Sequence, residues 1–104
     1  MLESLEVSHF EPLQGHPQAF ETVDGNTLEL YVEAVTVKPQ SRPAGDGGRM
    51  PFTVSLSARA PTRFVEGLCA VELPGIGRVE NILVSRQAAL GRDPQQAYFQ
   101  ILFN

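Results

Sequence analysis

The chain has 104 residues and a formal net charge of −4, with 42% hydrophobic and 19% charged residues. These values are typical of one globular domain and exclude both a disordered chain and a second domain. They also disfavour a dedicated nucleic-acid-binding protein, because contacts to phosphate need a surplus of basic side chains.

The cysteine content and the lengths of the apolar stretches indicate the cellular compartment of the protein. Cys69 is the single cysteine, so no internal disulfide forms. Residues 1–6 have neither a basic start nor an apolar run, unlike a secretory signal. The longest strongly apolar stretch, residues 82–84, is far shorter than the roughly 20 residues that a membrane helix needs. We therefore expect a cytoplasmic protein with no membrane partner.

The first predicted element is a short helix. Apolar residues recur every third position from Val7 to Leu13, which is helical spacing. Ser8 followed by Glu11 fits a capping box. This pattern predicts about two turns of helix over residues 8–14, whose apolar face lies like a lid on the rest of the fold.

The next predicted elements are two strands joined by a hairpin turn. Residues 20–23 precede an Asp-Gly-Asn turn at 24–26, and a long strand follows at 27–38. Within that second strand the apolar residues change parity, from the even positions 28, 30 and 32 to the odd positions 35 and 37. The change predicts a β-bulge or a sharp bend near Glu33 and Ala34, because only a bend keeps both apolar sets facing inward.

The second half of the chain predicts further strands. Residues 39–51 hold three prolines and three glycines, and we expect a long flexible loop there. Alternating apolar residues then predict strands at 52–58, 68–73, 78–86 and 97–104. The fold class is mainly β. A short N-terminal helix precedes a strongly bent, five- to six-stranded antiparallel sheet that forms a small open barrel, in one domain over residues 1–104.

Residue types that carry chemistry are sparse. His9 and His16 match no metal-ligand spacing, and Cys69 alternates with inward-facing Val71 and Leu73. A buried thiol is normally inert, since burial disfavours the thiolate. No acid–base pair or nucleophile motif stands out by its spacing. We expect a protein that is not an enzyme and that has no metal or cofactor.

The last strand indicates contact with other proteins. Its pattern turns Ala97, Phe99, Ile101 and Phe103 inward and leaves Tyr98 and Leu102 on the nominally outer face. These two side chains either contact a partner or lie under the N-terminal helix or the long loop. An open sheet also leaves edge strands that can pair with a second copy or another chain.

Arginines offer an alternative kind of site. Four of them flank the long loop and the end of the 52–58 strand: Arg42, Arg49, Arg59 and Arg63. If they converge, they can bind phosphate or an acidic partner. Neighbouring glutamates favour scattered surface charge instead.

Several stretches together carry a family resemblance: Met1 to Leu5, Phe10 to Gly15, Leu28 to Leu30, Pro51 to Val54, Gly67-Leu68 and Tyr98 to Asn104. They resemble a family of bacterial domains of about 100 residues with no assigned function. Such domains are loosely associated with genes for phage-tail-like collar proteins. The resemblance implies a structural or assembly role and carries over no catalytic residue.

The order of a helix followed by bent antiparallel strands is also similar to the Sm-like small barrels. That family binds RNA through an Asp and an Asn in a strand–turn pattern. Here residues 25–35 lack that pair and carry glutamates instead. We therefore expect a protein-interaction or assembly module, with Sm-like RNA binding through the four arginines as the alternative.

Overall fold

The computed structural model describes residues 4–38 and 51–104. A short helix α1 (Val7–Phe10) runs into a 3-10 turn η2 (Glu11–Leu13). Six strands follow: β1 (Pro17–Thr22), β2 (Thr27–Val37), β3 (Phe52–Ala58), β4 (Glu66–Leu73), β5 (Gly77–Gln87) and β6 (Ala97–Phe103). The predicted mainly β fold with one short N-terminal helix is confirmed.

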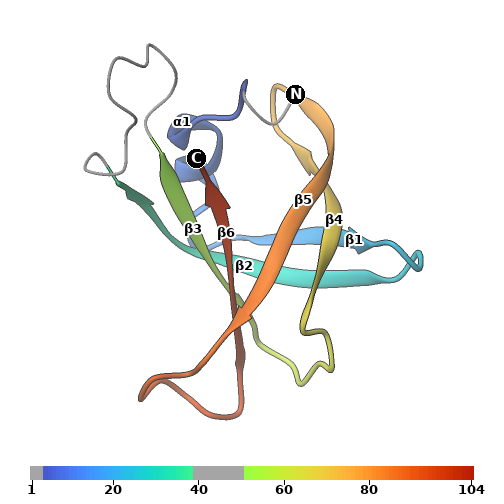
Figure 1. Ribbon diagram of the computed structural model, residues 1–104, viewed down its shortest axis with the longest axis vertical. Coiled ribbons are helices and arrows are strands. Elements are labelled where there is room, and N and C mark those ends of the chain that lie inside the picture. The colour runs from blue at the N-terminus through green and yellow to red at the C-terminus, as the bar shows by residue number, and fades with distance from the viewer. Residues whose placement is uncertain (1–3, 39–50) are drawn as a thin grey trace.

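The strands close into a small antiparallel barrel in the order β1-β2-β3-β6-β5-β4 (Figure 1). Most sequence neighbours pair as hairpins, whereas β3 pairs with β6 and β4 pairs with β1. The barrel is closed where we expected an open one. Closure gives each strand a neighbour on both sides and reduces the free edges that an open sheet would expose.

The predicted bulge in the long strand is confirmed. The pairing of β2 with β3 shifts between Val32 and Ala34, so that Glu33 is the extra residue. The Ser57 hydroxyl donates a hydrogen bond to the Glu33 carboxylate, and Arg59 lies 3.2 Å from the same carboxylate oxygen. Ser57 alternates with the apolar residues of β3, yet it is fully buried, and the bulged Glu33 lies over its hydroxyl.

The N-terminal helix closes one end of the barrel, beside the C-terminal end of β6 (Figure 1). Phe10 is buried, and its ring centroid lies 6.0 Å from that of Phe52 and 5.4 Å from that of Phe103. The lid prediction is therefore confirmed. The cap was misplaced: the helix begins after Glu6, whose backbone N–H donates to His9 Nδ1 at 2.9 Å.

Boundary differences are small, and the two largest fall at strand starts. β1 begins at Pro17, three residues before the predicted strand, since proline is tolerated as a first strand residue. β4 begins at Glu66, two residues before the prediction. The predicted flexible loop at 39–51 lies outside the described residues except for Pro51, which is buried.

Candidate functional site

The two predicted contact residues on β6 have different surroundings. Tyr98 is only 7% exposed. Its hydroxyl donates to the backbone oxygen of Asp93 at 3.2 Å, and the Arg92 guanidinium lies 3.8 Å from its ring centroid. Leu102 is 57% exposed. The connection between β5 and β6 therefore covers Tyr98, and only Leu102 offers substantial surface to a partner.

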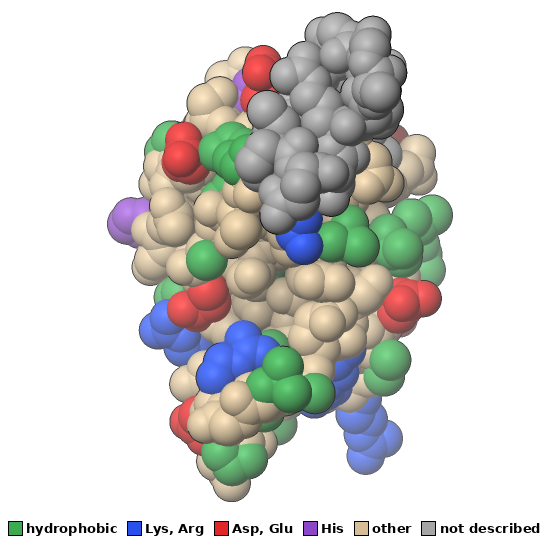
Figure 2. Space-filling view, turned by 60° about the vertical axis from the view of Figure 1, so that its left-hand side comes forward, with side chains coloured by type: hydrophobic (Ala, Val, Ile, Leu, Met, Phe, Trp, Pro, Cys, Tyr) green, Lys and Arg blue, Asp and Glu red, His purple; other side chains and the backbone are tan. Residues whose placement is uncertain are grey.

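The four arginines are not seen to converge. Arg42 and Arg49 lie outside the described residues. Arg59 pairs with Glu33 and lies 3.9 Å from the Tyr31 ring centroid, whereas Arg63 lines a groove described below. Figure 2 shows Lys and Arg side chains on the same face as Asp and Glu side chains. The described surface on this face carries charges of both signs.

Three residues considered for chemistry sit in ordinary positions. Cys69 is buried in the core as predicted, and burial raises the pKa of its thiol. His9 accepts the capping hydrogen bond of α1, and His16 is exposed beside the start of β1. Within residues 4–38 and 51–104, no three His, Cys, Asp or Glu side chains gather as a metal site would require.

The barrel surface is hollowed where β1 meets β4. Their antiparallel ladder holds only two residue pairs, Glu21 with Ala70 and Thr22 with Cys69. Hollows of about 280 Å³ and about 400 Å³ lie against this junction. Both are lined by Thr22, Val23 and Leu68, so we treat them as one feature, the β1–β4 groove.

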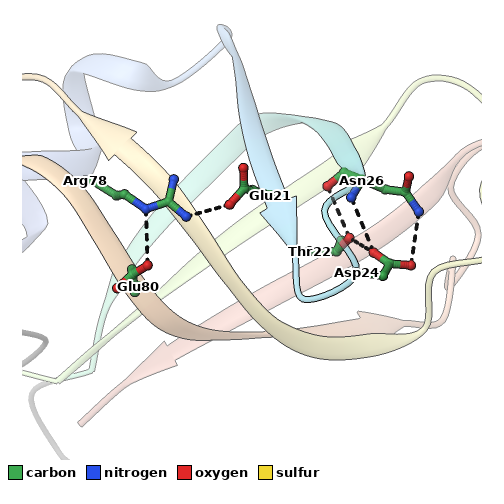
Figure 3. Close-up of polar contacts among 6 residues, drawn as sticks. All are labelled: Glu21, Thr22, Asp24, Asn26, Arg78 and Glu80. Atoms are coloured by element: carbon green, nitrogen blue, oxygen red, sulfur yellow. Dashed lines mark hydrogen bonds and ion pairs between the residues drawn. The ribbon is translucent and has the colours of Figure 1, made fainter.

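Ion pairs frame the smaller hollow. Arg78 on β5 lies 2.5 Å from a Glu21 carboxylate oxygen on β1 and 3.2 Å from one on Glu80 (Figure 3). Both carboxylates raise the pKa of Arg78. Because Arg78 reaches across β4 to Glu21, the bridge ties β1 to β5 over the two-pair ladder. All three side chains are substantially exposed, so the bridge adds little stability and mainly fixes the wall of the hollow.

A bulge in β5 shapes the same wall. The pairing of β4 with β5 shifts between Cys69 and Val71, so that Glu80 and Asn81 together face Ala70. Asn81 has φ +63°, a left-handed conformation that asparagine tolerates better than most residues. The bulge explains why apolar residues occur on both parities of this strand.

The β1–β2 turn forms the wall shared with the larger hollow. The Thr22 hydroxyl donates to the Asp24 carboxylate, which also accepts from the Asn26 side-chain amide at 3.0 Å (Figure 3). The bond from Thr22 and those from Asn26 hold the pKa of Asp24 below its ordinary value of 3.8. The turn is therefore a defined loop with an ionised carboxylate at neutral pH.

Apolar side chains lie open at the centre of this polar frame. Val23 is 85% exposed, and Leu68 is also exposed. The sequence pattern held a signal for Leu68, since an inward-facing Cys69 puts its neighbour on the outer face. It held none for the groove, which exists because the β1–β4 ladder stops after two pairs.

These features define a small closed antiparallel barrel whose candidate site is a surface groove rather than an enclosed cavity. The chain belongs to DUF6916, a domain of unknown function, whose family model matches residues 5–103. No curated protein and no solved structure matches the chain significantly. No helix in the described ranges has the length and apolar character needed to cross a bilayer.

Proposed function

We propose that this domain is a non-enzymatic protein-interaction module that binds a partner chain through the β1–β4 groove. The observation that carries this proposal is the exposure of Val23 and Leu68 at the centre of a hollow with a polar frame. Apolar side chains within a polar rim are typical of protein contact surfaces. An assembly role of this kind also agrees with the resemblance to domains that are loosely associated with genes for phage-tail-like collar proteins.

The test compares surface variants in affinity capture. The double variant Val23→Lys/Leu68→Lys places charge in the groove without touching the core. Leu90→Lys is the matched control, because Leu90 is equally exposed but does not line the groove. We expect a protein in lysate of the source cells to be retained by the wild type and Leu90→Lys and lost by the double variant. Equal capture by all three proteins would refute the groove as the contact site.

Self-association through a strand edge is a narrower form of the same proposal. Because the barrel is closed, unpaired strand edges remain only where the ladder between two neighbouring strands is short. The β5–β6 ladder is such a place, since it holds only three residue pairs. Leu102 and Leu83 are both exposed on these two strands. Light scattering on the eluting protein tests this form. A strict monomer excludes it, and an oligomer that Leu102→Lys dissociates would establish it.

RNA binding in the manner of Sm-like barrels is the second candidate. The small antiparallel barrel and the exposed Arg63 in the groove favour it, whereas the ion pair of Arg59 with Glu33 opposes it. Titration of the protein with single-stranded RNA at two salt concentrations tests for RNA binding. Salt-dependent binding that falls when Arg42, Arg49, Arg59 and Arg63 are replaced would support it. Absence of binding at low salt would exclude it.

A further inference from the structure

The main chain at the start of β4 has hydrogen-bonding groups that pair with no strand in the described part of the chain. Glu66 pairs with Ser85 of β5, and the Arg86 N–H donates to the Val65 oxygen at 2.8 Å. In an antiparallel ladder, alternate residues direct both main-chain groups to the same side. Val65 and Gly67 therefore point toward β5, and Glu66 and Leu68 point toward the β1 side.

On that side β1 ends beside Cys69 and Leu68. The Thr22 N–H donates to the Asn26 oxygen at 2.8 Å, which closes the hairpin and directs the main-chain groups of Thr22 to β2, so that the N–H of Val23 faces β4. The last β1–β4 pair is Thr22 with Cys69, which places Val23 opposite Leu68 and leaves Glu66 beyond the end of β1. The N–H and carbonyl groups of Glu66 and the N–H of Leu68 therefore face the larger hollow of the β1–β4 groove, which both residues line.

The hollow also has room for the side chain of an added strand. Gly67 faces the barrel interior between Glu66 and Leu68, and the nearest atoms to a Cβ placed on it would be those of the Phe64 ring at 3.5 Å. Leu28 and Phe64 line the same hollow and are partly buried against the core. An inward-facing apolar side chain of a neighbouring strand would pack beside Gly67 against these two residues.

We propose that the larger hollow binds an extended segment of a partner protein, which adds as a strand to the free edge of β4 at Glu66 and Leu68. This inference rests on the proposed interaction function and specifies the form that the partner takes. The recognised chemistry is an extended backbone with one apolar side chain directed at Leu28 and Phe64. Because Asp24, Glu66 and Arg63 put both signs of charge around the hollow, binding depends little on salt.

Replacing Glu66 by proline tests the role of the main chain. Glu66→Pro removes the N–H that faces the hollow and breaks no bond to β5, and proline is tolerated as the first residue of a strand. Glu66→Ala is the matched control, because it removes the same side chain and keeps the N–H. The probe is a synthetic peptide taken from a random linear seven-residue library selected on the wild-type protein.

We expect the selected peptide to bind the wild type and Glu66→Ala within about threefold and Glu66→Pro at least tenfold more weakly. One lost main-chain hydrogen bond and the steric bulk of the proline ring account for that factor. Binding should also slow hydrogen exchange at the Glu66 and Leu68 amides. If Glu66→Pro fails to fold, Gly67→Val replaces it, because the added methyl groups fill the hollow and leave both amides in place.

The outcomes separate this inference from the proposed function. If the library yields no binding peptide, strand addition is refuted, and capture of a folded partner through Val23 and Leu68 still stands. A peptide that binds Glu66→Pro and Gly67→Val as well as the wild type also refutes it. If a second copy of the chain occupied the groove, the protein would form a dimer that Glu66→Pro dissociates and that the peptide does not displace. That result would overturn the assignment to a separate partner.

Discussion

Truncation of Phe10 tests whether the N-terminal helix is part of the barrel core. Phe10 is 1% exposed and contacts the rings of Phe52 and Phe103, which come from β3 and β6. Replacing a buried phenylalanine by alanine costs about 3–5 kcal/mol, which includes the cavity left behind. A domain of this size has a free energy of unfolding of roughly 5–15 kcal/mol. We therefore expect Phe10→Ala to remove between a fifth and nearly all of the free energy of unfolding.

The assay is urea unfolding followed by far-ultraviolet circular dichroism. With a urea dependence of about 1–3 kcal/mol per molar, the midpoint for Phe10→Ala should fall by at least about 1 M. Leu90→Ala is the control. Leu90 is 85% exposed, so its truncation should change the free energy of unfolding by less than about 0.5 kcal/mol. A loss below about 1 kcal/mol for Phe10→Ala would refute the reasoning and mean that the helix docks independently of the barrel.

Three further substitutions probe local features. Gly67→Ala should raise the free energy of unfolding by about 0.4–1 kcal/mol, because its Cβ would make only ordinary contacts and the unfolded chain loses freedom; a lower urea midpoint would contradict this. Asp24→Ala should lower the melting temperature at pH 7. The folded-state pKa of Asp24 is lowered, so its contribution is complete above the unfolded pKa and disappears as the pH falls through the folded value. The difference from the wild type should therefore shrink below about pH 4, and a difference that is constant from pH 7 to pH 3 would exclude this origin. Leu90→Asn should stabilise the fold by up to about 1 kcal/mol, since leucine at φ +51° occupies a left-handed conformation that asparagine tolerates better; thermal unfolding measures it, and a destabilised variant would contradict the argument.

Much of the fold follows from the alternation of apolar residues. A barrel interior accepts only inward-facing apolar side chains, so the parity change around Glu33 is enough to locate the bulge. The same logic placed Cys69 in the core and Ile101 on the inner face of β6. These predictions succeeded because each depends on one strand and its own period.

Features that depend on several elements could not be predicted in this way. The pattern correctly put Tyr98 on the outer face, but its burial comes from Arg92 on the preceding connection, and the strand period carries no information about that contact. Ser57 is buried for a similar reason, because Glu33 of another strand covers it. The β1–β4 groove depends on where a ladder between distant strands stops, which is decided by the closure of the whole barrel.

The adjacency of β3 and β6 has a consequence for folding kinetics. The β1–β2 and β4–β5 hairpins join residues close in sequence, whereas the β3–β6 ladder pairs Phe52 with Phe103. Closing so long a loop costs chain entropy before its contacts form, which slows folding. Docking of β6 onto β3 is thus expected to limit refolding, and Ile101→Val should slow refolding in stopped-flow experiments while leaving unfolding nearly unchanged. Faster unfolding with unaltered refolding would instead place this ladder after the rate-limiting step.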